Sequence, residues 1–307
     1  MPRWLRITLI ILVLLLVTGG GAYYWLIGDG NPPGTLQAYR LDLEAVRAKA
    51  EELPGGKASA IEVETIARFS FPAVAAVGGD GWEGKPLGVF SYQIVLPTDT
   101  IVVDTAFPAD LVTGIDADID AAAYARMDQA MADATQIVVT HEHADHIGGI
   151  VANDDPARLQ KALRLTSEQV ASLPSYGLAL PTALSDYMPL DYADMIALAP
   201  GVVLVRAPGH TPGSQLVYVK REDGRELLFI GDIGWTERNI ETGKGRPRLV
   251  SQFILNEDRD AVFAELAWLK ALHEAEPDLA IVPGHDLEAV DALVASGALR
   301  AGFTSQF

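Results

Sequence analysis

Four apolar, β-rich runs in this chain end in the same way, with a side chain that can bind a metal where the run gives way to a loop. Strands that end at one rim of a sheet can hold such side chains rigidly while leaving them open to a small molecule. The fold must therefore bring four distant strand ends together. The four residues are His141 after "QIVVT", His210 after "VRAPG", Asp232 after "LLFIG" and His285 after "AIVPG".

The densest of these points is "THEHADHIGGI" at residues 140–150. His141 and His143 are two apart, so in an extended segment they project to the same side. Asp145 and His146 follow after the chain begins to turn, and the two glycines beyond them permit a close helix or turn start. One short segment can thus present ligands in two directions. This suits two adjacent metals better than one.

Together these elements resemble the metallo-β-lactamase superfamily of metallo-hydrolases. "HEHADH" corresponds to the H-x-H-x-D-H motif of the family, and "VVDTA", "PGHTPGS", "GD" at 231–232 and "PGH" at 283–285 stand in the family's order. The resemblance covers residues 60–300 approximately. It implies an α/β fold, the four-layer αβ/βα sandwich of that family. The apolar N-terminal run indicates one transmembrane helix before it.

The resemblance also implies a role for each matching residue. Asp232 would bridge two metal ions, and both Asp145 and Asp232 would take part in catalysis by moving a proton. Asp104, in "VVDTA", would orient a ligand histidine, as many metal-binding histidines require. The first metal would be held by His141, His143 and His210, and the second by Asp145, His146 and His285.

The chemistry of these side chains restricts the cofactor. The chain contains no cysteine, so nitrogen and oxygen must hold any metal. Neutral imidazoles and carboxylates suit two divalent ions, zinc above all, with iron or manganese as alternatives. Two metals about 3.5–4 Å apart can share a hydroxide, because coordination lowers the pKa of water. Such a hydroxide would attack a small-molecule substrate, which predicts a metal-dependent hydrolase.

Several functions remain open at this level. The expected substrate is an ester, a lactone or an amide-type small molecule. A lactonase proper and a β-lactamase proper are alternatives. Quorum-quenching lactonases carry a tyrosine three residues after the bridging aspartate, whereas this chain has Trp235, which lacks a hydroxyl. The same scaffold also supports mononuclear iron oxygenases that act on persulfides. A metal-stabilised binding protein without turnover is a further alternative.

The N-terminus indicates a compartment. Arg3 and Arg6 precede residues 7–27, which carry no charge. At about 1.5 Å per residue this run spans roughly the 30 Å of a bilayer core, and Trp4 and residues 23–25 lie where aromatic belts occur. We expect a single-pass anchor in the cell membrane with the catalytic body outside the cytoplasm. The alternative is a cleaved signal peptide and a secreted protein.

The remaining sequence gives an outline of the chain. Its formal net charge of -18 repels phosphate backbones, which argues against nucleic acid as a partner, and no signal indicates an oligomeric state. We expect three parts: an anchor or signal segment over 1–28, a linker and amphipathic helix over 29–59, and a catalytic domain over 60–307.

Individual elements follow from periodicity and turn signals. Glu142 and His273 are not expected to bind metal. The aromatic side chains near 82–92 and within 153–200 would line a substrate pocket, cover the core or form a surface that meets the membrane. The predicted helices are 35–53, 121–134, 257–275 and 287–296, with helices and loops over 153–200. The predicted strands are 60–69, 88–97, 100–107, the "QIVVT" run, 201–210, 214–222, 226–232 and 279–285.

Overall fold

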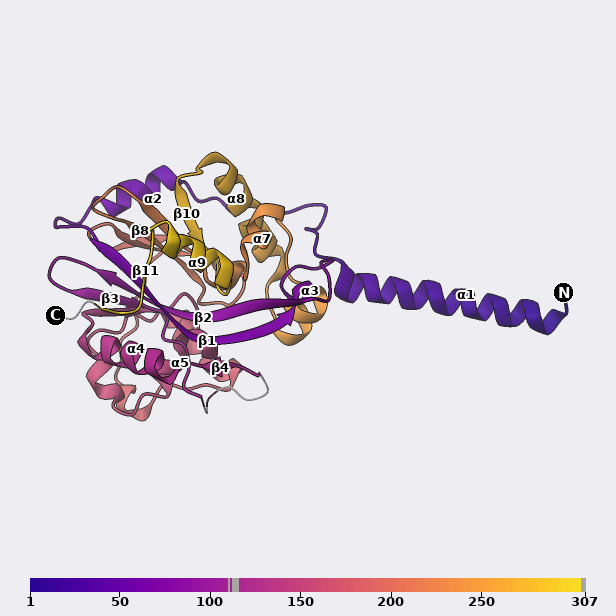
Figure 1. Cartoon of the computed structure of the whole chain (residues 1–307), viewed down its shortest axis with the longest axis horizontal. Coiled ribbons are helices and arrows are strands. Elements are labelled where there is room, and N and C mark those ends of the chain that lie inside the picture. Colours follow the sequence, from indigo (N-terminus) through magenta and orange to yellow (C-terminus); the bar gives the residue numbers. More distant parts are fainter. Residues whose placement is uncertain (110, 112–115, 305–307) are drawn as a thin grey trace.

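Two β-sheets face each other in the computed structural model, which describes residues 1–109, 111 and 116–304 (Figure 1). The first sheet has the strand order β11-β1-β2-β3-β5, and β4 pairs with β1. Its central pairs are antiparallel, whereas β3 runs parallel to β5 and β1 parallel to β11. The strands are β1 (Ala60–Pro72), β2 (Gly84–Val95), β3 (Thr100–Val103), β4 (Asp118–Ile119), β5 (Gln136–Val138) and β11 (Arg300–Ala301).

The second sheet has the order β10-β9-β8-β7-β6. Only its β9–β10 pair is parallel. The region 153–200 was predicted to hold helices and loops alone, and this is wrong at its end, where β6 pairs with β7. The strands are β6 (Met195–Ala199), β7 (Val202–Arg206), β8 (Gln215–Lys220), β9 (Glu226–Phe229) and β10 (Leu279–Val282).

Side chains alternate between the two faces of each strand. Val202 and Leu204 of β7 pack between the sheets, whereas Val203 and Val205 face the outer helices. Both faces of these strands are therefore buried. This explains why the strands appear in the sequence as continuous apolar runs rather than as alternating ones.

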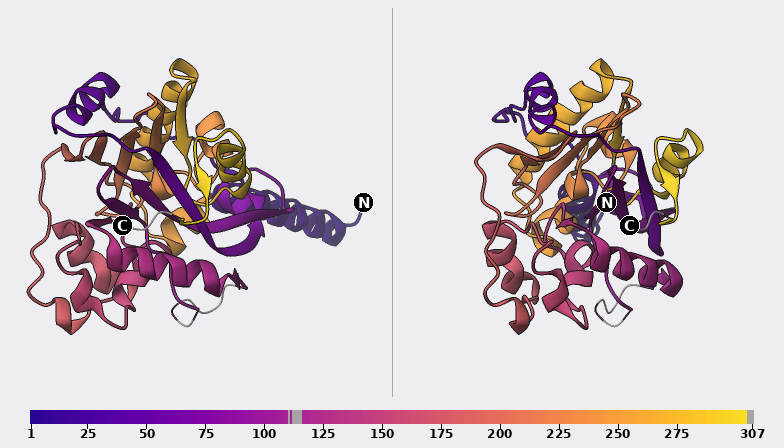
Figure 2. Two further views of the ribbon diagram at one scale, coloured as in Figure 1. Left: turned by 60° about the vertical axis from the view of Figure 1, so that its left-hand side comes forward. Right: turned by 90° about the vertical axis from the view of Figure 1, so that its left-hand side faces the viewer.

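Helices cover the outer face of each sheet. Helices α4 (Ala121–Asp133) and α5 (Ala144–Val151) pack on the first sheet, and α8 (Arg259–Ala275) packs on the second. Figure 2 shows the magenta helices on one side of the sheets and the orange α8 on the other. The result is the four-layer αβ/βα sandwich that the sequence implied. The shorter helices are α3 (Ala73–Ala76), α6 (Ser167–Ser172), α7 (Glu237–Thr242) and α9 (Leu287–Ala295), with 3-10 turns at η2 (Pro156–Leu159), η3 (Leu173–Tyr176), η4 (Thr182–Leu184) and η5 (Gly231–Ile233).

The helix predicted over 35–53 is much shorter in the structure. Only α2 (Leu43–Ala50) forms, and the Asp42 side chain caps it by accepting from the backbone N–H of Glu44. Tertiary hydrogen bonds hold the chain before it: Tyr39 donates to a carbonyl of β7, and the carbonyl of Leu41 accepts from α8. Helix α8 likewise begins at Arg259 rather than directly after Asn256.

Helix α1 (Arg3–Tyr23) projects from the body and continues into a short π-helix, η1 (Tyr24–Gly28) (Figure 1). The combined helix has a mean hydropathy of 2.2 in its most apolar window, and none of that window is buried. Its length and composition are those of a membrane span, and signal sequences share both properties. The structure therefore contains the predicted N-terminal apolar helix.

A core substitution tests the packing of α8 on the second sheet. Leu266 is fully buried there. We expect Leu266→Ala to lower the free energy of unfolding by about 2–5 kcal/mol, because it leaves a cavity. Glu274→Ala, on the exposed side of the same helix, should change it by less than about 0.5 kcal/mol. Denaturant unfolding measures both, and equal midpoints for wild type and Leu266→Ala would contradict this packing.

Candidate metal centre

Loops that follow strands of both sheets place the predicted residues at one rim of the sandwich. His141 lies three residues after β5, and His143 is the N-cap residue of α5. Asp232 lies in the 3-10 turn after β9, and His285 lies three residues after β10. The loop after β7 brings His210 to the same place. The four strand-end residues thus converge as the pattern predicted, and the other three ligands that the resemblance implied, His143, Asp145 and His146, lie with them.

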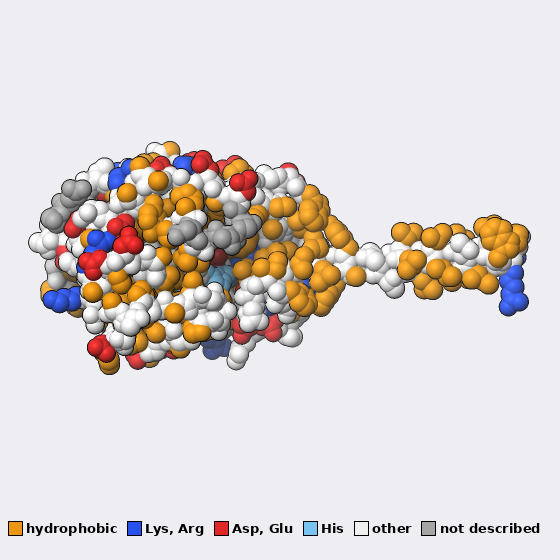
Figure 3. Space-filling model, turned by 90° about the horizontal axis from the view of Figure 1, so that it is seen from below, with side chains coloured by type: hydrophobic (Ala, Val, Ile, Leu, Met, Phe, Trp, Pro, Cys, Tyr) orange, Lys and Arg blue, Asp and Glu red, His pale blue; other side chains and the backbone are white. Residues whose placement is uncertain are grey.

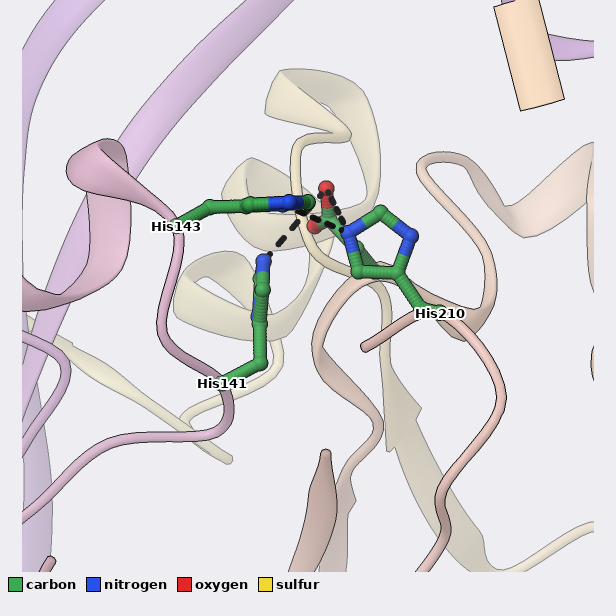
Figure 4. A group of neighbouring side chains, drawn as sticks. His141, His143 and His210 are labelled. Carbon is green, nitrogen blue, oxygen red and sulfur yellow. Dashed lines mark hydrogen bonds and ion pairs between the residues drawn. The ribbon is translucent and has the colours of Figure 1, made fainter. Parts of the chain in front are cut away.

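Three histidines and one aspartate form a first cluster. Figure 4 shows the rings of His141, His143 and His210 directed at a common point. Nε2 of His210 lies 2.9 Å from Nδ1 of His143 and 3.5 Å from Oδ2 of Asp232. Nε2 of His141 lies 4.0 Å from the same oxygen. One ligand atom from each of the four residues lies within 4.8 Å of the others, an arrangement that can hold a metal ion.

A second cluster adjoins the first. Oδ2 of Asp145 lies 3.5 Å from Nε2 of His285 and 3.8 Å from Nε2 of His146. The other carboxylate oxygen of Asp232, Oδ1, lies 3.1 Å from Nε2 of His285 and 3.4 Å from Nε2 of His146. Oδ2 of Asp232 lies 3.3 Å from Nε2 of His285 as well. The carboxylate of Asp232 therefore lies between the two clusters and contacts residues of both, the position that a bridging ligand would occupy.

The buried polar atoms of the clusters fit metal ions. Within the described part of the chain, Nε2 of His141, Nε2 of His146 and Oδ1 of Asp232 are buried and have no hydrogen-bond partner. Buried polar atoms are normally paired, so three unpaired ones at one point call for a ligand. Imidazole nitrogens and carboxylate oxygens are donors that zinc accepts. The donor set and its unpaired atoms therefore suit metal binding.

Contacts behind the rings fix which nitrogen faces the clusters. Nδ1 of His285 donates to the Gly88 carbonyl at 2.8 Å, and Nδ1 of His146 donates to Oδ2 of Asp104 at 2.9 Å. Nδ1 of His210 donates to the carboxylate of Glu257 at 2.6 Å. Each of these hydrogen bonds uses Nδ1 and so directs Nε2 of the same ring toward the cluster. Partners of this kind orient metal-binding histidines in general.

Burial and local charges set different protonation states for the residues of the two clusters. Burial, and then the neighbouring His146, hold the pKa of His141 well below its usual value, and burial and His210 do the same for His143. Burial opposes ionisation of Asp232, but His285 and His146 outweigh it and hold its pKa well below the usual range. Burial would also lower the pKa of His146 and His285, but Asp104 raises the pKa of His146 well above its usual value and Asp232 raises that of His285. The first cluster thus places two neutral imidazoles beside an ionised carboxylate, whereas metal binding at the second would release protons.

Asp104, predicted to orient a ligand histidine, lies directly behind His146. Its Oδ1 accepts from the backbone N–H of Thr140 at 2.6 Å, and its Oδ2 accepts from the Thr140 hydroxyl at 2.9 Å. Its backbone adopts a φ of 59°, in the left-handed region that few residues other than glycine, asparagine and aspartate occupy. These contacts aim the carboxylate at the ring of His146.

Two residues behind the first cluster were missed by the sequence reasoning. Glu257 forms a buried ion pair with Arg246 and accepts from His210. Nη2 of Arg246 also donates to the backbone carbonyl of Asp232 at 2.7 Å. Burial would raise the pKa of Glu257, but Arg246 and His210 hold it below the usual value. Neither residue lies in a recognisable motif, so no sequence signal pointed to them.

Trp235 contacts the site in a way that its sequence position did not indicate. Its indole Nε1–H donates to Oδ2 of Asp232 at 2.6 Å. Its ring meets the ring of His285 edge to face, with 5.8 Å between centroids, and the Arg246 guanidinium lies 5.1 Å from its centroid. The indole thus positions the carboxylate that faces both clusters.

The other residues considered from sequence have separate places. Glu142 lies outside both clusters, and it accepts hydrogen bonds from Ser172 and Thr211. Among the aromatics of the 153–200 region, Tyr176 reaches the site: its ring centroid lies 4.4 Å from that of His143. The other residues that were candidates for a pocket lie elsewhere. Phe90, Tyr92, Tyr187 and Tyr192 lie in the core or pack against it, and Trp82 and Met188 are exposed.

Comparison with known proteins establishes the family. The family model of the metallo-beta-lactamase superfamily matches residues 84–285 of the 307-residue chain. The fold and the two clusters, taken with this match, define a metal-dependent hydrolase. The chain belongs to the metallo-beta-lactamase superfamily.

Several known proteins resemble it. An N-acyl homoserine lactonase from Bacillus sp is 28% identical over 109 residues, which are 36% of this chain and 42% of that lactonase. A solved quorum-quenching N-acyl homoserine lactone hydrolase has a TM-score of 0.61 at 18% identity, over 83% of this chain and all of that one. The structure of a probable metal-dependent hydrolase from Staphylococcus aureus has a TM-score of 0.58 at 14% identity, over 76% of this chain and 91% of that one. The structural likenesses show the shared fold.

Substitution of Glu257 tests its role behind His210. We expect Glu257→Gln to weaken metal binding by about 10–100-fold, because the charge that orients the imidazole is lost. Competition with a chelator measures the affinity. Glu265→Gln is a matched control: burial, and then Glu257, raise the pKa of Glu265 well above its usual value, so an amide there replaces a neutral acid. Equal affinities in the two variants would contradict the role of Glu257.

Substitution of Trp235 tests the indole hydrogen bond. Trp235→Phe keeps an aromatic ring beside His285 but removes the N–H that Asp232 accepts. A hydrogen bond to a charged group is worth about 1.5–3 kcal/mol, so metal affinity should fall about 10-fold or more. Trp268→Phe, which loses a hydrogen bond to the Leu41 carbonyl, should leave the affinity unchanged. If both variants bind metal like wild type, the indole does not position Asp232.

Proposed function

We propose that this chain is a dinuclear hydrolase that opens a lactone or ester bond in a small molecule, with a zinc ion at each cluster. The observation that carries the proposal is the placement of Asp232, whose buried carboxylate lies between the two clusters and contacts histidines of both. Two metals held here would lower the pKa of a bound water toward 7 and polarise the carbonyl of the substrate. The complete second cluster favours this function over a single-iron oxygenase.

The two carboxylates differ in exposure, and this suggests different roles. The side chain of Asp145 is 30% exposed, whereas that of Asp232 is 5% exposed and accepts a hydrogen bond from Trp235. We assign proton transfer to Asp145, whose carboxylate would take a proton from the attacking water and return it to the leaving alkoxide oxygen. Asp232 would contact both clusters and so fix their position relative to each other.

The lactone part of the proposal rests on the relatives. The curated relative is named as an N-acyl homoserine lactonase, although the match covers less than half of its length. The chain departs from the lactonase pattern at Trp235, whose N–H is directed at Asp232 and which has no hydroxyl to assist a carbonyl. In this chain the phenol ring of Tyr176 contacts a cluster residue, His143. A substrate outside the homoserine lactones would fit this difference.

We also propose that α1 is a single-pass membrane anchor and that the body lies outside the cytoplasm. The helix is long and apolar enough to cross a bilayer, and all its side chains before η1 are exposed. Arg3 and Arg6 precede the apolar run, and the positive-inside rule places them on the cytoplasmic side. Cleavage as a signal peptide would instead release the body on the same side.

Elemental analysis and a substrate panel test the hydrolase. Anaerobically purified protein should contain two divalent ions per chain and hydrolyse members of a panel of lactones, esters and β-lactams. Asp145→Ala should lower kcat by about 100-fold or more, the usual contribution of a positioned acid or base. His143→Ala should lower both metal content and turnover.

Asp154→Ala, an exposed carboxylate a few residues after the motif, serves as the control and should keep full turnover. Turnover that survives both Asp145→Ala and His143→Ala would place the reaction elsewhere. Active protein with one iron and oxygen consumption would favour the oxygenase instead.

A further inference from the structure

Exposed apolar side chains gather on the body where α1 joins it (Figure 3). They come from three segments far apart in sequence: the end of α1 with η1, the loop before β2, and a π-helix, η6 (Leu249–Ile254). On a chain with a net charge of -18, such a concentration of apolar surface marks an interaction site. We call this patch the collar, and its members are Tyr23, Trp25, Trp82, Leu249, Phe253 and Ile254, each 40–66% exposed.

Contacts join the three segments into one surface. The Trp82 indole N–H donates to the Tyr23 hydroxyl at 3.0 Å, which ties the loop before β2 to the end of α1. The rings of Trp25 and Phe253 meet edge to face with 6.3 Å between centroids, which ties η1 to η6. The guanidinium of Arg248 lies 5.3 Å from the Trp25 ring centroid. The collar thus surrounds the point where α1 meets the body.

Helix η6 exposes three of its apolar side chains and buries a polar one, although Val250 packs on the core and Gln252 is exposed. Its apolar side chains Phe253 and Ile254 are 63% and 66% exposed, whereas Ser251 is buried and its hydroxyl hydrogen-bonds within the body. A helix at the surface of a water-soluble domain buries its apolar face and exposes its polar one. The orientation of η6 therefore suits an apolar environment outside the body.

The chain between α1 and the body is fixed rather than free. The linker expected after residue 28 contacts the body, since the carbonyl of Gly30 accepts from the Gly245 N–H at 2.9 Å. The carbonyl of Asp29 accepts from Nη2 of Arg259 at 3.1 Å. A Cβ at Gly30 would lie 2.5 Å from the Gly78 carbonyl oxygen, so the backbones are in close contact. The collar therefore has a set position relative to α1.

We propose that the collar docks on the outer surface of the lipid bilayer that α1 crosses, with its aromatic side chains at the boundary between headgroups and acyl chains. The inference rests on the proposal that α1 spans a membrane. If it does, Tyr23 and Trp25 lie at the interface, where tryptophan and tyrosine are enriched. Trp82 and Phe253 touch these two residues and must lie at a similar depth. A second copy or a partner protein that covered the same patch would have to lie beside α1 at the membrane surface.

Single-cysteine labelling tests this proposal in the full chain, because the natural sequence contains no cysteine. We would place an environment-sensitive fluorophore at Phe253→Cys and, separately, at Trp82→Cys, and reconstitute the protein in phosphatidylcholine vesicles. Phospholipids spin-labelled near the headgroup should quench both probes, and emission should shift to the blue. Quenching should be several-fold stronger than at Met188→Cys, an apolar control position that is 84% exposed and outside the collar.

A probe at Leu12→Cys, in the middle of α1, separates the two proposals. Quenching of this probe by lipids spin-labelled near the chain end shows that α1 spans the bilayer. If Leu12 is quenched while Phe253 and Trp82 behave like Met188, α1 is an anchor and the collar proposal is overturned. Blue-shifted but unquenched emission at Phe253 and Trp82 would mean that protein covers the collar, which also overturns it. An unquenched Leu12 would reject the membrane span itself, whatever the hydrolase assay gives.

Discussion

The rest of the site depends on the contacts between the buried carboxylate of Asp232 and the histidines around it. The carboxylate is buried, and its oxygens face histidines carried by loops after β5, β7 and β10. A buried charge is costly unless hydrogen bonds, opposite charges or metals compensate it. Here the Trp235 N–H and the surrounding imidazoles contribute, and metals would complete the compensation. The rim of the sandwich is thus organised around a charge that an apolar core alone would not accept.

The parts of the structure that follow from short-range patterns could be predicted from the sequence. Strands such as Val202–Arg206 are apolar throughout because both of their faces are covered, and that composition is visible without coordinates. The spacing of the motif at 141–146 indicated ligands in two directions, and the resemblance to the family implied which metal each of its four side chains would hold. His210 and His285 were found because each follows an apolar run and a glycine. Asp104 was identified by the resemblance to the family, and it does contact His146.

The features that were missed depend on contacts between distant segments. Glu257 and Arg246 lie in a part of the chain without a motif, and only the folded chain brings them behind His210 and Asp232. The helix over 35–53 is shorter than its periodicity suggests, because tertiary hydrogen bonds hold the extended chain around Tyr39. Local propensity is a weak guide where such contacts compete with it. Trp235 was noted as an unusual residue, but its hydrogen bond was not foreseeable.

The backbone conformation of Asp104 limits which residues can replace it during evolution. Its φ of 59° suits glycine, asparagine and aspartate best. Glycine there would offer no acceptor to Nδ1 of His146, and asparagine would offer no charge. Conformation and chemistry therefore select the same residue independently. Substitutions at position 104 should therefore be rare. Substitutions of the exposed residues around the rim can still change which substrates the site accepts.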